Sequence, residues 1–218
     1  MYFRLLHDDR CGSVSYLLGD LDAGEAVVID PRGGDVPLLL AMLAEQRLRL
    51  RGVLRTHEHD AQLPQRERTA LAQLGAPVVG AQAPPGGCVV VGSEHLHVLA
   101  TPGHTAHCLS FRWRDRLFCG GLVQGADCPH QPSPALPEAL WDSVTRQLLP
   151  LPDETLLFHG HAAAGRAVGT VLELRRWHPW FGAASRDEFL TRVMPPPEPA
   201  APAAPWPAAR SAAPVTAR

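Results

Sequence analysis

Histidines gather at two places in the sequence, and their spacing suits the binding of a divalent metal ion. His57 and His59 follow the apolar run from Leu48 to Leu54, and His104 lies in the turn from Thr101 to Thr105. Where a buried strand ends in a loop, two histidines at positions i and i+2 can bring neutral imidazoles to one ion. The sequence therefore predicts a metal site that draws on His57, His59 and His104.

The segment from Thr56 to Gln62 resembles the Thr-His-x-His-x-Asp-His signature of the metallo-β-lactamase fold. His57 and His59 match the first two histidines of that signature, whereas Ala61 stands at its aspartate position and Gln62 at its last histidine position. The resemblance therefore implies that the second metal position has lost two ligands.

The resemblance covers roughly residues 2 to 194 and follows the layout of the glyoxalase II group, with the persulfide dioxygenases as the nearest match. Besides the histidine segments, it rests on Phe118-Cys119-Gly120-Gly121, Leu151 to His161 and Asp187-Glu188-Phe189. It implies an α/β protein with the αββα sandwich of the metallo-β-lactamases. His161 matches the histidine that serves the second metal in dinuclear relatives, and His159 is an alternative to it.

Gly121 stands where the resembling enzymes carry an aspartate ligand. The persulfide dioxygenases hold a single iron by two histidines and one aspartate, and His57 and His104 match the two histidines. Without the carboxylate, the site should favour Zn(II) over a redox-active iron triad. We expect at most one ion, Zn or Fe, held weakly or not at all. The resemblance implies that the substitution Gly121→Asp would return the anionic ligand and raise iron occupancy.

Three functions remain open on the sequence alone. The first is an enzyme of the persulfide dioxygenase type, which acts on a glutathione-linked or other small thiol sulfur substrate. The second is a glyoxalase II-like thioester hydrolase, a hydroxyacylglutathione hydrolase, because a three-histidine zinc site with a bound water is a competent hydrolytic arrangement. The third is a non-catalytic relative that serves as a binding module.

Hydrophobic patterns predict the elements that must position these histidines. We expect strands at residues 14–18, 26–29, 51–54, 78–79, 88–91, 97–99, 109–113, 117–119 and 155–158. We expect helices at residues 35–46, 65–74, 136–148 and 166–177. Strands with helices inserted between them, repeated once along the chain, indicate a layered α/β architecture.

The composition fits one enzyme-sized domain. A chain of 218 residues with 45% hydrophobic residues can bury a substantial core, and its net charge of -2 indicates no preference for nucleic acid. Residues 195–218 are rich in Pro and Ala, so we expect a disordered tail after a domain at residues 1–194.

The remaining features bear on location and partners. Five widely spaced cysteines indicate neither a disulfide framework nor a zinc ribbon. No run approaches the roughly 20 apolar residues that span a bilayer, so we expect a cytoplasmic protein without membrane contact. The expected partner is a small-molecule thiol or thioester, and a homodimer stays open because dimers are common in the resembling group. The other histidines should be exposed or locally bonded: His7, His95, His97, His107, His130 and His178.

Overall fold

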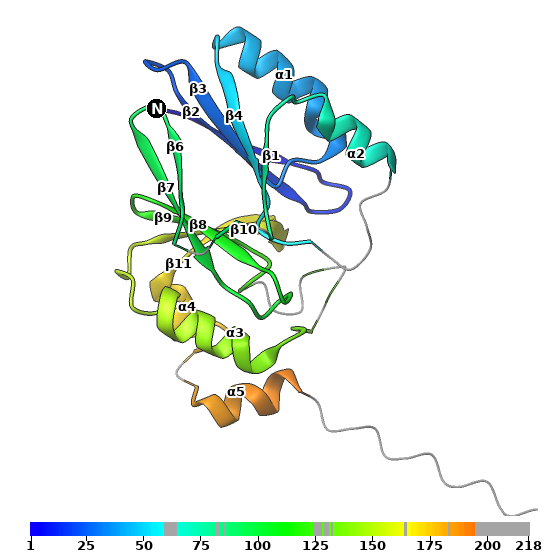
Figure 1. Ribbon diagram of the computed structural model, residues 1–218. Coiled ribbons are helices and arrows are strands. Elements are labelled where there is room, and N and C mark those ends of the chain that lie inside the picture. Colours follow the sequence, from blue (N-terminus) through cyan, green and yellow to red (C-terminus); the bar gives the residue numbers. More distant parts are fainter. Residues whose placement is uncertain are drawn as a thin grey trace, which may run out of the picture.

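The computed structural model describes residues 1–58, 65–81, 83–84, 86–123, 128, 131, 133–163, 165–182 and 184–194. Two β-sheets face each other, and helices cover the outer face of each (Figure 1). The layers follow the order helix, sheet, sheet, helix, which confirms the predicted αββα sandwich. The tail predicted at residues 195–218 lies outside the described residues.

The first sheet has the strand order β1-β2-β3-β4-β5. Its strands are β1 (Tyr2–His7), β2 (Val14–Asp20), β3 (Glu25–Ile29), β4 (Arg49–Leu54) and β5 (Val78–Val79). β1, β2 and β3 are antiparallel, whereas β3, β4 and β5 run parallel. Parallel neighbours need crossover connections, and these contain the short 3₁₀ turn η1 (Gly33–Asp35) with α1 (Val36–Glu45), and then α2 (Gln65–Ala72).

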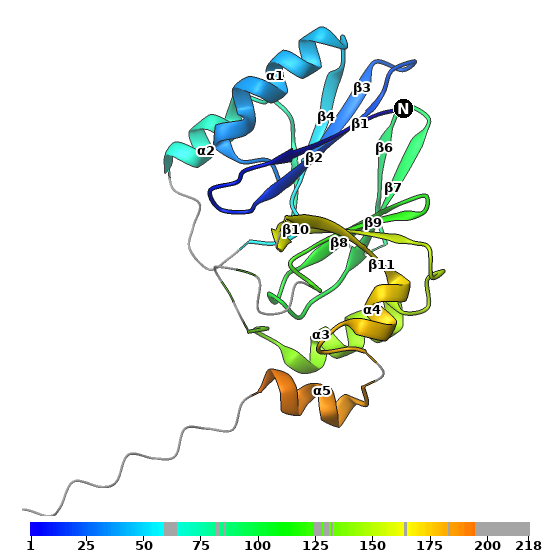
Figure 2. The same cartoon turned by 180° about the vertical axis from the view of Figure 1, so that it is seen from behind.

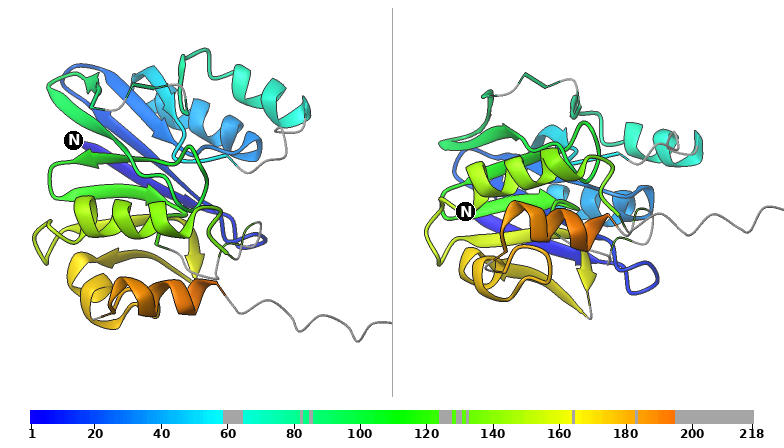
Figure 3. Two further views of the ribbon diagram at one scale, coloured as in Figure 1. Left: turned by 60° about the horizontal axis from the view of Figure 1, so that its bottom comes forward. Right: turned by 90° about the horizontal axis from the view of Figure 1, so that it is seen from below.

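The second sheet has the strand order β11-β10-β9-β8-β7-β6. Its strands are β6 (Cys88–Val91), β7 (Glu94–Ala100), β8 (Leu109–Trp113), β9 (Arg116–Gly120), β10 (Leu156–Ala163) and β11 (Arg166–Thr170). The parallel pair β9 and β10 is joined through α3 (Pro137–Ser143) and the π-helical turn η3 (Val144–Leu148). Figure 2 shows α3, α4 (Val171–Trp177) and α5 (Arg186–Val193) on the outer side of this sheet, and α3 and α5 lie side by side in the right view of Figure 3.

Side chains alternate between the two faces of each strand, and the buried hydrophobic residues form three clusters. In β2, Tyr16 and Leu18 face the second sheet, whereas Leu17 packs with α1. In β9, Phe118 faces the first sheet and Leu117 packs beneath the helices of the second. A strand that is buried on both faces reads as a continuous apolar run, which is why these strands could be predicted from the sequence.

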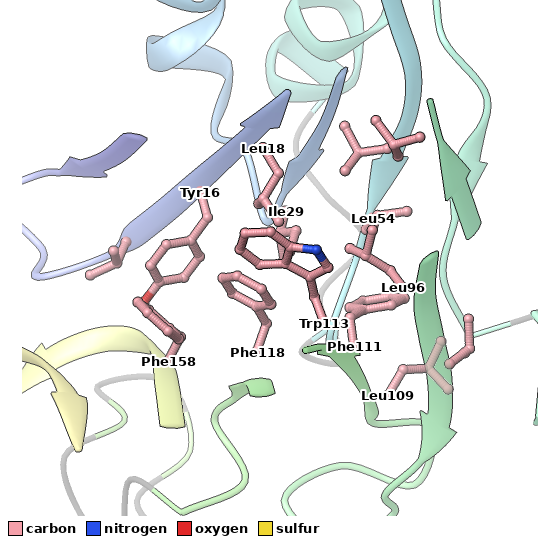
Figure 4. Packing of buried hydrophobic residues seen from close by; sticks show 14 residues of the cluster. Tyr16, Leu18, Ile29, Leu54, Leu96, Leu109, Phe111, Trp113, Phe118 and Phe158 are labelled. Atoms are coloured by element: carbon pink, nitrogen blue, oxygen red, sulfur yellow. The ribbon is translucent and has the colours of Figure 1, made fainter. Parts of the chain in front are cut away.

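Aromatic rings fill the space between the sheets (Figure 4). The ring centroids of Tyr16 and Phe118 lie 5.1 Å apart, and those of Phe118 and Phe158 lie 4.9 Å apart. The Tyr16 hydroxyl donates a 2.5 Å hydrogen bond to the carbonyl of His159, and burial raises the pKa of Tyr16 well above its usual value. These contacts fix β2 against β10.

The predicted helix at residues 166–177 is wrong in its first five residues, which form β11 and pair with β10. The helix begins only after Thr170, whose hydroxyl accepts a hydrogen bond from the Glu173 amide while the Glu173 carboxylate accepts one from the Thr170 amide. This capping box defines a helix start. The helix predicted at residues 136–148 changes at Val144 into the π-helical turn.

Candidate metal centre

His57 lies just beyond the carboxyl end of β4, at the edge where the two sheets meet. The Thr56 carbonyl accepts a 2.7 Å hydrogen bond from the amide of Leu109, the first residue of β8. This bond ties the loop after β4, in the first sheet, to the second sheet. It therefore brings half-buried His57 toward the turn that carries His104.

The Asp30 carboxylate binds the loop that carries His57. Asp30 follows β3 with a left-handed backbone (φ 47°), and its carboxylate accepts hydrogen bonds from the Thr56 amide at 2.8 Å and the Thr56 hydroxyl at 2.5 Å. Burial raises the pKa of Asp30, while the Arg55 cation and both bonds from Thr56 act in the opposite direction. A left-handed residue other than glycine is uncommon, and here it aims a carboxylate at the histidine loop.

The same contacts define the protonation of His57. Its Nδ1 lies 2.8 Å from the Thr56 hydroxyl oxygen. The Thr56 hydroxyl donates to Asp30, so the tautomer with a proton on Nδ1 is the one in which His57 donates to Thr56. The Nε2 atom then carries a lone pair, which is the form that a metal ion requires. Such an outer partner is what orients metal-binding histidines in general.

His104 is buried in the turn between β7 and β8. A backbone hydrogen bond from Thr101 N to Cys108 O at 2.9 Å closes this turn, and one from Ala135 N to the His104 carbonyl at 3.1 Å ties it to the segment before α3. The ring centroids of His57 and His104 lie 4.9 Å apart at an interplanar angle of 73°. Two imidazoles bound to one tetrahedral zinc ion through bonds of about 2.1 Å have centroids roughly 5 Å apart. The separation of these rings therefore suits one shared ion.

Two consecutive glycines pack against the two histidine loops. A Cβ on Gly120, where φ is +54°, would lie 2.1 Å from Thr56 Oγ1, so only glycine fits there. A Cβ on Gly121 would lie 2.4 Å from Cε1 and 2.5 Å from Nδ1 of His104. The His104 ring thus occupies the room that a side chain at position 121 would need.

This packing bears on which metal the residues fit. The iron site that the resemblance implies, with two histidines and one carboxylate, would place an anionic side chain at position 121, and the His104 ring fills that space. The described residues do not fit that iron triad. The His57 and His104 pair supplies two imidazoles, a ligand type that zinc accepts, whereas catalytic zinc sites use three protein ligands. Within the ranges described, no group of three or more His, Cys, Asp or Glu side chains is arranged to hold a metal ion.

The other predicted ligands take different positions. His59 lies outside the described residues, as do Ala61 and Gln62. His161 is buried in β10 and, together with His159, lines a pocket beside β11 and α4. Burial is the main cause that lowers the pKa of His159 to about 4. The assignment of His57, His59, His104 and His161 as ligands stays a prediction.

Two buried thiols lie close to the site. Cys108 Sγ lies 3.2 Å from both the amide and the hydroxyl of Thr105, and 4.0 Å from His104 Nδ1. Burial raises the pKa of Cys108, and it raises the pKa of Cys119 to about 12. In the absence of a metal ion both therefore stay protonated at neutral pH, so neither is an activated nucleophile.

Sequence reasoning missed Asp30 and Thr56 as partners of His57. The signal was present, since Asp30-Pro31 ends a strand that pairs with the strand before the histidines. The prediction for the remaining histidines holds where they are described. His7, His95, His97 and His107 are exposed, His178 bonds locally to Trp180 N and also to the distant Val123 O, and His130 lies outside the described residues. None of the described helices is long and apolar enough to cross a membrane.

Comparison with known proteins finds relatives of two kinds. A hydroxyacylglutathione hydrolase of Cereibacter sphaeroides is 33% identical over 67% of this chain, which spans 61% of that protein. The mitochondrial persulfide dioxygenase ETHE1 of Bos taurus is 29% identical over 88% of this chain and 79% of its own length. The chain thus spans about three fifths of the hydrolase that it matches. No family model matches the sequence.

Solved structures agree with the sequence relatives. The crystal structure of ETHE1 from Myxococcus xanthus superposes with a TM-score of 0.77 at 34% identity, and the match covers 91% of this chain and 93% of that one. A metallo-β-lactamase from Staphylococcus aureus superposes with a TM-score of 0.75 at 24% identity, over 93% of this chain and 68% of that one, and supports the fold.

Proposed function

Because the chain belongs to the metallo-β-lactamase fold and, within it, to the glyoxalase II group near ETHE1, we propose that it is a thioester hydrolase. Its proposed substrate is a thioester of glutathione or of another small thiol, and its proposed site is a single zinc position without a carboxylate ligand. The observation that carries this proposal is the pairing of His57 and His104 at 4.9 Å together with the loss of room for a side chain at position 121.

The residues that would hold the ion are His57 and His104, with His59 as the third imidazole predicted from the sequence. A zinc ion held there would lower the pKa of a bound water to about 7 and polarise the thioester carbonyl. The protein's own part is to orient the ligands. Asp30 and Thr56 keep the proton of His57 on Nδ1, and Gly120 and Gly121 let both histidine loops close onto the end of β9.

The site supports a dioxygenase less well than it supports a thioester hydrolase. A dioxygenase of the persulfide type relies on iron bound by two histidines and a carboxylate with open positions for oxygen and thiol. Gly121 supplies no carboxylate, and the His104 ring fills its place. Thioester hydrolysis needs only a Lewis acid and a bound water, so it survives this loss.

A non-catalytic binding module is the second candidate. The observation in its favour is that Ala61, Gln62 and Gly121 stand at three ligand positions of the resembling enzymes. Metal affinity depends strongly on ligand number, and a site that has lost these ligands would lose its ion readily. The fold would then serve to bind a thiol compound without turnover.

One set of measurements separates these functions. Purified protein is reconstituted with Zn(II) or Fe(II), its metal content is measured, and it is then assayed for cleavage of an acyl-glutathione and for oxygen uptake with glutathione persulfide. We expect about one zinc per chain, thioester cleavage, and loss of both in the variant His57→Ala. Metal below about a tenth of an equivalent would overturn the hydrolase and leave the binding module. Oxygen uptake by the iron form would establish the dioxygenase instead.

A further inference from the structure

A cavity of about 280 Å³ lies on the outer side of the second sheet, between β10, β11 and α4. We refer to it as the β10–α4 pocket. The residues that matter for its chemistry are His159, His161, Arg166, Gly169, Glu173 and Trp177. Its volume lies just below the roughly 300 Å³ at which ligand pockets of proteins usually start, which limits an occupant to a small molecule of one or two rings.

The floor of the pocket is apolar and its rim carries an aromatic ring. Val123, Leu157 and Leu174 line the floor and are buried. Trp177 is 68% exposed, the highest exposure among the large hydrophobic side chains of the described residues. A tryptophan in water at the edge of a cavity offers a flat face for an aromatic ligand to stack on. The shape and surface of the pocket therefore favour a planar, apolar molecule.

A polar niche lies in the wall at Gly169. A Cβ at this position would lie 3.4 Å from His159 Nε2 and 3.4 Å from Glu173 Oε2. The absence of a side chain therefore leaves one imidazole nitrogen and one carboxylate oxygen on the border of the same small space. Glu173 Oε2 already accepts the Thr170 amide at 2.9 Å, but a carboxylate has about four lone-pair sites. A ligand group that can donate to Glu173 and either donate to or accept from His159 suits this niche.

The charges around the niche disfavour an ionic ligand. Arg166 pairs with Glu173 and also donates from Nε to the Val168 carbonyl at 3.0 Å. His178 accepts the Trp180 amide at Nδ1 over 3.1 Å, so its Nε2 carries the proton and donates to the Val123 carbonyl at 2.9 Å. The imidazole of His178 is thus neutral, and the cation and the anion at the rim compensate each other. An added anion would face Glu173 and an added cation would face Arg166.

We propose that the β10–α4 pocket binds a small uncharged aromatic alcohol, a phenol or naphthol, with its ring against Trp177 and its hydroxyl between His159 and Glu173. A hydroxyl group is suited to this place because it donates to the carboxylate and keeps two lone pairs for the imidazole. The pocket opens on the helix side of β10, whereas Gly160 in the same strand faces His57. The niche at Gly169 is therefore separate from the His57 and His104 pair, while His161, the fourth predicted ligand, lines the same pocket.

The test is a titration of the metal-free protein by calorimetry with three ligands of similar shape. These are 2-naphthol, 2-methoxynaphthalene, which lacks the donor, and 2-naphthoate, which is an anion. We expect 2-naphthol to bind at least tenfold more tightly than either of the others. Equal affinity for 2-naphthol and 2-methoxynaphthalene, or no measurable binding of 2-naphthol by folded protein, overturns the proposal. Because no metal is present, this result is independent of the proposed hydrolase activity.

Two variants locate the binding. Gly169→Ala adds a Cβ at ordinary contact distance, 3.4 Å from its neighbours, so the protein should fold normally while the niche is narrowed and affinity for 2-naphthol falls at least tenfold. Trp177→Ala removes an exposed ring and should lower affinity about fivefold. Gly34→Ala, with nothing within 4 Å of the added Cβ, and Leu38→Ala, at 55% exposure on α1, are the matched controls. Unchanged affinity in both pocket variants would overturn the location.

Discussion

The substitution Gly121→Ala tests the packing that separates this site from an iron triad. The added Cβ would lie 2.4 Å from Cε1, 2.5 Å from Nδ1 and 3.0 Å from Nε2 of His104. Non-bonded carbon atoms prefer separations of about 3.5 Å or more, so the ring must retreat by about 1 Å. His104 is only 3% exposed, and its surroundings leave it little space to do so.

The cost should appear in both stability and zinc binding. Overpacking of a buried position typically costs about 1–3 kcal/mol. In a domain of this size that corresponds to a fall in Tm of about 2–12 °C. A ring displaced by about 1 Å no longer meets the ion that His57 would share, and a disturbed ligand arrangement lowers metal affinity by about 10- to 100-fold.

Thermal unfolding of the metal-free protein and zinc competition with a chelator measure the two effects separately. Gly34→Ala is the matched control, since its Cβ would have nothing within 4 Å and neither glycine has a positive φ. If Gly121→Ala kept both the Tm and the zinc affinity of the parent, the contact between position 121 and the His104 ring would be refuted.

The same contact changes the outcome expected for Gly121→Asp. The resemblance alone predicts higher iron occupancy, because a carboxylate returns to the ligand position. The structure adds that the carboxylate can enter only by displacing the His104 ring, which is itself a predicted ligand. We therefore expect no gain in iron, measured as metal content after Fe(II) reconstitution. One full equivalent of iron in this variant would contradict the described packing.

Three further predictions follow from neighbouring residues. Thr56→Val removes the hydroxyl that orients His57, so zinc affinity should fall about 10- to 100-fold in chelator competition; an unchanged affinity would show that the tautomer of His57 is set elsewhere. His159 has its pKa lowered to about 4 by burial, so the unfolded chain takes up a proton first as the pH falls from about 6.5 to 4, and about 3 kcal/mol of unfolding free energy is lost over that window. Urea unfolding at several pH values checks this, and the loss should vanish in His159→Gln. Tyr16→Phe leaves the buried His159 carbonyl without its 2.5 Å donor and should destabilise the protein by about 1–3 kcal/mol; a change below about 0.5 kcal/mol in urea unfolding would contradict it.

Much of the fold could be predicted because its strands are short apolar runs bounded by turn residues. β6 and β8 have the predicted bounds, and β4 ends at Leu54 before the histidines, as predicted. The wrong predictions lie where the apolar spacing suggested a helix but a capping motif marks a different helix start. Apolar spacing across residues 166–177 suggested one helix, whereas the Thr170 and Glu173 capping box marks its true start. A similar box at Ser185 and Glu188 begins α5, for which no helix was predicted.

The candidate site divides in the same way. The sequence identified His57 and His104 as partners because each follows a recognisable turn, and their rings do lie together. It could not indicate that the His104 ring occupies the space of a side chain at position 121, because that depends on the distance between two loops in space. Nor could it indicate the β10–α4 pocket, which is assembled from residues between Val123 and Pro179.

The aromatic cluster packs the two sheets together without using the predicted metal ligands. Tyr16, Phe118 and Phe158 join the two halves of the sandwich without any help from the histidine loops. A zinc finger collapses when its ion is removed, whereas these ring contacts involve none of the predicted metal ligands. Substitutions among the metal ligands should therefore leave the packing between the sheets intact. The reaction that such a scaffold supports can then change in evolution while the chain still folds.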